Sequence, residues 1–228
     1  MIRTLTLALL LPVPVAAQTA FTAPAGCEVF VTIQTNSCTV SHLFRCEDDP
    51  EGYLRRANFG EEGLDYAGLI DGETQWLESF YPQGDAFETL VPDPADPMSL
   101  TDLMETGIST FDFEIENQEG ERYRFVGFDQ ITGDPVEIDG VTLTPTEYNI
   151  RMVDQSGETI WTARGDEFIH EEWRSFLSGT GVSARTGEEE VAEDYSPIEF
   201  IFPGEDGFLS AQPKYQCGLT EMSFEVQP

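Results

Sequence analysis

The histidines and carboxylates of this chain are the side chains that could do acid–base or metal chemistry. Two histidines occur, His42 and His170, and His170 is followed directly by Glu171 and Glu172. An imidazole beside carboxylates can bind a metal ion or act as a base. Because no second histidine lies near His170 in the sequence, we favour a solvated surface for this group. For His42 we favour a partly buried, hydrogen-bonded side chain.

Calcium is the most serious cofactor candidate, because hard oxygen ligands are plentiful. Neither of the two acidic groups that could supply them contains a recognisable calcium-binding loop, so solvated loops are the default and no metal ligand is assigned. The two groups are Asp129, Asp134 and Asp139, and Glu188, Glu189, Glu190, Glu193 and Asp194.

Signatures of known catalytic sites are missing from the sequence. It contains no G-x-S-x-G, H-E-x-x-H, P-loop or G-x-G-x-x-G motif. A pair of carboxylates for glycoside chemistry has little value as a signal, because 43 acidic residues place some pairs within reach in any fold. We therefore assign no catalytic residue, and the sequence favours a protein that is not an enzyme. A buried acid pair in a cleft, with one strongly raised pKa, would revive the enzyme hypothesis.

Four cysteines, Cys27, Cys38, Cys46 and Cys217, predict two disulfides in an exported protein. None forms a C-x-x-C motif. A two-residue turn at residues 36–37 would place residues 27–35 opposite residues 38–46, and Cys27 would then face Cys46. In the same register Val31 faces His42 and Ile33 faces Val40. This pairing leaves Cys38 for Cys217.

The first residues predict the compartment. Arg3 precedes an apolar run over residues 5–15, which is too short to span a bilayer and ends in small residues. Residues 1–17 are thus predicted to be a cleaved signal peptide, followed by a single exported β-rich domain over residues 18–228. No cysteine closely follows the run, so a lipoprotein is not expected. We expect a periplasmic or secreted protein with no further transmembrane segment.

The charge balance limits the partners. The chain has 43 acidic and 11 basic residues, a formal net charge of −32, and Lys214 is its one lysine. Such a chain repels nucleic acid and anionic membranes. Acidic residues are spread along the whole sequence, which favours a solubilising surface over a dedicated binding patch. A cationic partner or calcium is the functional alternative.

Frequent Pro and Gly residues and alternating apolar positions predict mostly β-strands. Turns at 118–120, 139–140 and 155–157 predict a meander over residues 110–165. The first pairs Ile115 with Tyr123 and Phe113 with Phe125. The second pairs Ile138 with Val141 and Val136 with Leu143, and the third pairs Met152 with Ile160 and Ile150 with Thr162.

Other elements are predicted more coarsely. Strands are expected at 53–59, 64–70, 74–81, 86–91, 198–202 and 222–226, and we favour strands over a helix for 166–179. Residues 186–194 are expected to be an exposed acidic loop. Ser99 as N-cap and Gly107 as terminator predict one short helix at 99–106.

The fold class predicted is therefore all-β: a single antiparallel sheet domain, a curved or barrel-like meander, with one short helix and two disulfides. Large aromatic residues alternate along the predicted strands and most simply fill a core. Alternatively, a concave sheet encloses an apolar ligand. The leading hypothesis is non-enzymatic binding of an apolar small molecule or lipid. The alternatives are an acidic envelope protein that binds a cationic partner or calcium, and last a carboxylate-based hydrolase. The sequence does not predict the oligomeric state.

Overall fold

The computed structural model describes residues 20–218, and these residues form an all-β fold on one antiparallel sheet. The predicted leader and the predicted strand at 222–226 lie outside the described residues. Strand order is β13-β12-β11-β10-β8-β7-β6-β5-β4-β3-β2-β1-β14, and β9 pairs with β10 beside this path. Most neighbours in the sheet are thus neighbours in the chain, which is the meander that the sequence predicts.

The elements have the following bounds: β1 (Cys27–Thr35), β2 (Val40–Cys46), β3 (Leu54–Gly60), β4 (Gly63–Ile70), β5 (Trp76–Tyr81), the 3₁₀ turn η1 (Pro82–Gly84), β6 (Ala86–Leu90), α1 (Leu100–Thr106), β7 (Ile108–Asn117), β8 (Arg122–Ile131), β9 (Val136–Ile138), β10 (Val141–Val153), β11 (Thr159–His170), β12 (Ser175–Arg185), β13 (Val191–Asp194) and β14 (Pro197–Ile201).

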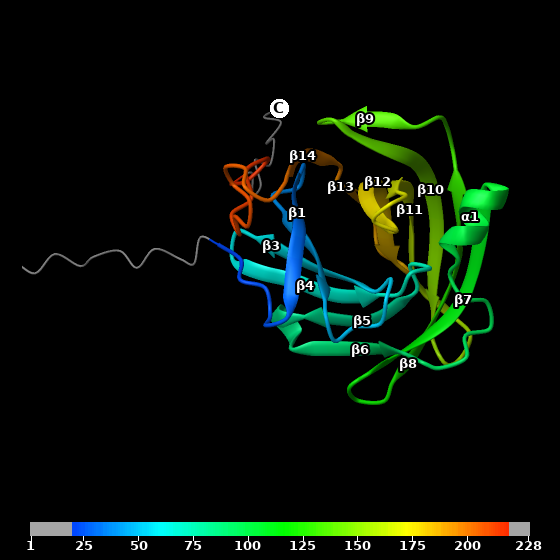
Figure 1. The fold of residues 1–228 in the computed structure, drawn as a ribbon. Coiled ribbons are helices and arrows are strands. Elements are labelled where there is room, and N and C mark those ends of the chain that lie inside the picture. Colours follow the sequence, from blue (N-terminus) through cyan, green and yellow to red (C-terminus); the bar gives the residue numbers. More distant parts are fainter. Residues whose placement is uncertain (1–19, 219–228) are drawn as a thin grey trace, which may run out of the picture.

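The sheet curls strongly. In Figure 1, β4, β5 and β6 run across the lower part of the molecule, whereas β7, β8 and β10 rise along its right side. The sheet is not closed: within residues 20–218 the edge strands β13 and β14 do not pair with each other. Other contacts draw its ends together. The Asn36 Nδ2 atom donates to Asp194 Oδ2 at 2.6 Å, and the Asn36 N–H donates to the Ser196 carbonyl at 3.0 Å.

Two disulfides secure the N-terminal hairpin, Cys27–Cys46 within it and Cys38–Cys217 from its tip to the C-terminal segment. These are the pairs expected from the sequence. The predicted register also holds for Val29, which faces Phe44, but it is wrong beyond that residue. A β-bulge between Val29 and Val31 shifts the pairing by one residue, so that Thr32, not Val31, faces His42.

The bulge also changes the turn and the faces of β1. Ile33 faces Ser41, not Val40, and a wider loop replaces the predicted two-residue turn: the Thr35 N–H bonds the Thr39 carbonyl. Because of the extra residue, Val29 and Val31 join different apolar clusters although they are two positions apart.

Two of the three meander hairpins have the predicted registers. Phe113 faces Phe125 across the β7–β8 turn, and Ile138 faces Val141 across the β9–β10 turn. The third register is wrong by one residue. Ile150 faces Ala163, because a bulge opposite Met152 and Val153 adds one residue, Ile160, to β11. Accordingly, Met152 faces Trp161 instead of Ile160.

The helix forms where its caps predict it. Ser99 Oγ accepts a hydrogen bond from the Asp102 N–H, and Gly107 ends α1 with a positive φ of 84°. The buried Leu100 and Leu103 pack against Ile169 of β11. The helix therefore covers one side of the curved sheet beside β7, as Figure 1 shows.

Residues 166–179 are strands joined by a turn, as predicted, since β11 and β12 pair from His170 and Ser175 onward. The expectation of a loop over 186–194 is wrong in part. Residues 191–194 form β13 on the edge of β12. Nothing in residues 20–218 is a helix of the length and apolar character needed to cross a membrane.

Candidate functional site

A cavity of about 380 Å³ lies inside the curve of the sheet. One wall comes from β3, β4 and β5, and the other from β7, β8, β10, β11 and β12. The two walls are far apart in sequence, so only the curvature of the sheet brings them face to face. Both contribute apolar side chains: Leu54, Ile70 and Trp76 on one wall, and Phe111, Ile150, Trp161 and Ala163 on the other.

One row of paired residues crosses the second wall and supplies its polar character. Asp129 of β8 faces Tyr148 of β10, which faces Gly165 of β11, and Gly165 faces Gly181 of β12. Gly181 makes room for the tyrosine, because a Cβ atom at this position would lie 2.7 Å from the Tyr148 hydroxyl. The Tyr148 ring thus extends across β11 toward β12, with Asp129 beside it.

Glu167 lines the same cavity, two positions along β11 from Gly165. Alternation along a strand puts Glu167 on the face of Trp161, Ala163 and Gly165. Its neighbour on β10 is Thr146. The row and Glu167 together place two carboxyl groups on one concave, largely apolar wall.

Arg56 lines the cavity from the opposite wall. Its guanidinium spans the interior from β3 to β12, where Nη2 donates to the Phe176 carbonyl and lies 3.3 Å from Ser175 Oγ. The charge of Arg56 is therefore held by backbone and hydroxyl oxygens of the protein itself, and no carboxylate within residues 20–218 forms an ion pair with it.

The two carboxyl groups are strongly perturbed. Burial raises the pKa of Asp129 to about 7, and its side chain is only 6% exposed. Burial, helped by the nearby Asp129 and opposed by Arg56, raises the pKa of Glu167 to about 8. Neither carboxyl group accepts a hydrogen bond from any group within residues 20–218. Isolated buried carboxylates cost stability, which is typical of groups kept for a ligand or a reaction.

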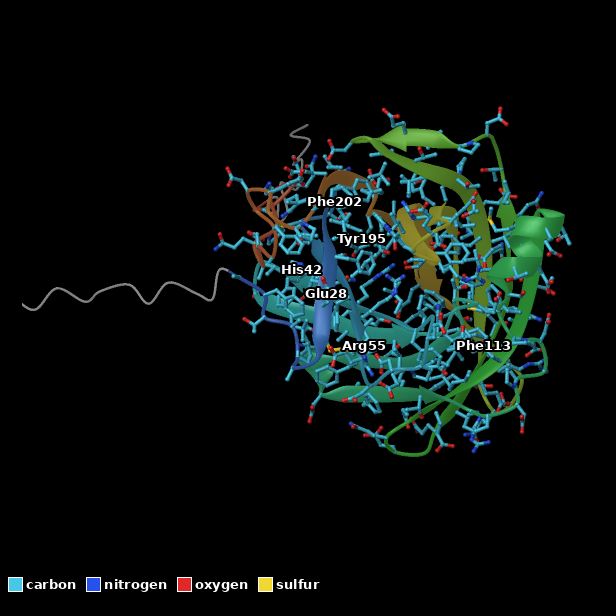
Figure 2. All side chains as sticks on the ribbon, viewed as in Figure 1. Glu28, His42, Arg55, Phe113, Tyr195 and Phe202 are labelled. Carbon is cyan, nitrogen blue, oxygen red and sulfur yellow. A yellow bond between two sulfur atoms is a disulfide. The ribbon has the colours of Figure 1, made fainter. Side chains whose placement is uncertain are left out.

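The cavity reaches solvent beside β13. Glu193 and Tyr195, which line it, are both exposed. Figure 2 labels Tyr195 between β1 and β12, near the upper part of the interior. Burial raises the pKa of the Tyr148 hydroxyl to about 12, with further contributions from Glu167, Glu193 and Asp166. Negative groups therefore surround Tyr148 from inside the cavity to its mouth.

His42 lies outside this cavity. It is buried, with an exposed fraction of 0%, and stacks on Phe21 with ring centroids 4.7 Å apart. Its Nδ1 atom lies within hydrogen-bond distance, 3.0 Å, of Thr32 Oγ1, which also accepts a hydrogen bond from the Leu209 N–H. Burial lowers the pKa of His42 to about 4, and the Ser210 backbone opposes this shift. His42 is therefore a hydrogen-bonded histidine of the core, as expected, but its side chain is more deeply buried than expected.

His170 is also not part of the cavity. Its ring stacks on Trp173 at 3.6 Å between centroids, and Nδ1 accepts the Trp173 N–H at 3.2 Å. Burial lowers the pKa of His170, while Glu172 and Glu171 act in the opposite direction. The imidazole is thus half-buried against Trp173, while Glu171 and Glu172 beside it are exposed.

The structure does not assemble the acidic groups considered for calcium. Asp129 lies in the cavity, Asp134 is exposed, and Asp139 accepts a hydrogen bond from the Phe200 N–H at 2.8 Å. Across residues 20–218, the one close group of potential metal ligands is Cys38, Cys217 and Glu61, and both cysteines are in a disulfide.

Glu167 and Arg56 were not among the candidates from the sequence. Both carry a signal that could have revealed them: each shares a strand face with apolar residues. Glu167 alternates with Trp161 and Ala163, and Arg56 with the buried Leu54. A charged residue on the apolar face of a strand predicts a buried charge, and hence a candidate site.

Comparison of the chain with family models, with curated proteins and with solved structures finds no match. Any functional conclusion therefore depends on the geometry of the cavity.

Proposed function

We propose that the protein binds an apolar small molecule, such as a single-chain lipid, in the cavity of its curved sheet. One observation carries this proposal: the interior holds about 380 Å³ of space between apolar and aromatic walls. Ligand sites of small proteins are typically concave, mostly apolar and roughly 300–1,000 Å³ in volume, with a few polar groups inside. The cavity has each of these properties.

The proposed location of this binding is the periplasm or the outside of the cell. Two disulfides support an oxidising compartment, because thiols of cytosolic proteins are generally kept reduced. A binding protein there would carry or buffer an apolar compound that is poorly soluble in water. The acidic surface would keep such a carrier soluble.

A fluorescence titration tests the proposal. The neutral probe N-phenyl-1-naphthylamine gains fluorescence when it enters an apolar site, and decanol should displace it. Ser183→Phe places a large ring in the cavity beside Ala163, since Ser183 lines the cavity and pairs with Ala163. Thr162→Phe adds the same ring on the exposed face of β11.

The expected result is saturable binding by the wild-type protein and by Thr162→Phe, with binding lost in Ser183→Phe. Equal binding by all three proteins would place the probe on the surface and overturn the proposal. Absence of binding by the wild-type protein would overturn it as well. Circular dichroism of each variant provides the control for folding.

A carboxylate-based hydrolase is a second candidate, because two carboxyl groups with raised pKa values, the buried Asp129 and the half-buried Glu167, line the cavity. Two features weigh against it. A catalytic acid–base pair needs pKa values pushed apart, and here both are raised. Catalytic carboxylates are also oriented by hydrogen bonds, which these two lack within residues 20–218. Release of nitrophenol from nitrophenyl glycosides, lost in Glu167→Gln and Asp129→Asn, would favour the hydrolase over the binding protein.

A further inference from the structure

We infer that the ligand of this cavity is an organic cation, an apolar body with one positively charged nitrogen, held by Asp129 and Glu167 among aromatic rings. This inference rests on the proposed binding function and names the chemistry of the ligand. It comes from the polar groups of the cavity, whereas the binding proposal comes from its apolar walls.

The two carboxyl groups lack partners in the described part of the protein. Asp129 is 6% exposed, lines the cavity, and receives no hydrogen bond or ion pair from any residue within 20–218. Glu167 lines the same space, and Arg56 acts on it only through its field, without an ion-pair contact. Buried carboxylates require a positive or hydrogen-bonding partner. A cationic ligand would supply the partner that the described protein does not.

Acidic groups outnumber basic groups on the walls of the cavity. The titratable groups that face it are Arg56, Tyr66, Asp129, Tyr148, Glu167, Glu193 and Tyr195. Arg56 is the one basic residue among them, and its Nη2 already donates to Phe176 and Ser175. An anionic ligand would therefore meet three carboxyl groups and one guanidinium, of which Nη2 is already bonded to the protein. A cationic ligand would instead be attracted by the three acidic groups.

Aromatic rings line the walls of the cavity near the two carboxyl groups. Tyr148 stands in the same row as Asp129 and one diagonal step from Glu167. Trp76, Phe111 and Trp161 complete the rings around the cavity. Aromatic faces attract cations, and quaternary ammonium groups are commonly bound in such surroundings. The net charge of −32 on the whole chain further raises the local concentration of cations.

Cation binding should be coupled to proton release. The pKa of Asp129 is about 7 and that of Glu167 about 8, so both groups are partly protonated near neutral pH. A bound cation favours the ionised forms and expels these protons. Affinity for a cation of fixed charge must then rise between pH 6 and pH 9. A neutral ligand of the same length should show no such rise.

Three ligands with the same chain test the inference: decyltrimethylammonium, decanol and decyl sulfate. The charges of the two ionic ligands do not change between pH 6 and pH 9. Binding is followed by displacement of N-phenyl-1-naphthylamine and by titration calorimetry, at concentrations below micelle formation. We expect decyltrimethylammonium to bind at least about tenfold more tightly than decanol, and decyl sulfate to bind most weakly.

Variants assign the preference to the two carboxylates. Asp129→Asn and Glu167→Gln should each lower the affinity for the cation about tenfold and leave that for decanol unchanged. They should also reduce the proton release. Asp134→Asn removes one exposed negative charge outside the cavity and should change neither. Thermal melting of each variant confirms that a lost affinity is not lost folding.

The outcomes separate this inference from the binding function. If decanol binds but the cation shows no preference, or decyl sulfate binds most tightly, the inference is overturned and the binding function stands. If no ligand and no probe binds, the binding function itself is overturned. Loss of cation preference in Asp134→Asn equal to that in Asp129→Asn would assign the effect to surface charge and overturn the inference too.

Discussion

Replacing Asp129 by Asn should stabilise the protein at alkaline pH. In the folded protein, burial raises the pKa of Asp129 from 3.8 to about 7. Between these two values the folded state keeps a proton that the unfolded chain has released. The free energy of unfolding therefore falls as the pH rises from about 4 to about 7, and the cost is complete above pH 7. Asparagine has no charge to lose and removes this dependence.

The magnitude follows from the size of the shift. A change of one pKa unit corresponds to about 1.4 kcal/mol, so Asp129 costs about 4 kcal/mol of stability above pH 8. At pH 5 the cost is only about 2 kcal/mol. The advantage of Asp129→Asn over the wild-type protein should thus grow by about 2–3 kcal/mol between pH 5 and pH 8.5.

Urea denaturation of both proteins at pH 5, 7 and 8.5 measures this growth. At pH 5 the folded protein holds Asp129 protonated, so the difference in free energy of unfolding there includes the difference in packing between the acid and the amide. The change in this difference with pH then reports the charge alone. Asp134→Asn, at an exposed position, is the matched control and should give a constant difference. A difference for Asp129→Asn that does not change with pH would refute the conclusion that Asp129 is an isolated buried carboxylate.

Three further predictions concern the framework. Because the pKa of His42 is lowered to about 4, the free energy of unfolding should fall by about 3 kcal/mol in total as the pH drops from 6.5 through 4. Urea denaturation of His42→Gln should not show this fall. An equal acid dependence in that variant would contradict the buried neutral histidine. Ser99→Ala removes the N-cap of α1 and should lower the free energy of unfolding by about 1 kcal/mol, whereas no change would mean that the cap is not used. Replacing Cys38 and Cys217 by alanine opens a long loop and should cost about 4–5 kcal/mol in urea denaturation, an effect that a small loss would disprove.

The fold was predictable to the extent that short turns determine register. Glycine at the third loop position fixes the β7–β8 hairpin at Gly120, and Gly140 fixes the β9–β10 hairpin, and both registers were right. The β1–β2 and β10–β11 registers failed because each contains a bulge, near Val31 and near Val153. A bulge adds one residue without a side-chain signature, so alternation alone does not reveal it.

The candidate site was predictable only in part. Aromatic alternation suggested a concave sheet, and Asp129 was noticed as an acidic residue near a turn. Its burial depends on how β8 and β10 pair and on the curl that faces them toward β3 and β4, which are long-range effects. Glu167 looked like part of a polar segment, Gly165-Asp166-Glu167. Alternation with Trp161 and Ala163 places Glu167 on the apolar face of β11, but only the curl of the sheet makes this face the wall of a cavity.

The central claim is that the interior of the sheet holds a ligand, and native mass spectrometry tests it most directly. The wild-type protein and Ser183→Phe would be purified from a bacterial periplasm and measured under native and denaturing conditions. Our account predicts a mass excess on the native wild-type protein that disappears on denaturation and is absent from the variant. A native wild-type protein with the bare mass of its disulfide-bonded chain, even after incubation with decyltrimethylammonium and decanol, would contradict it.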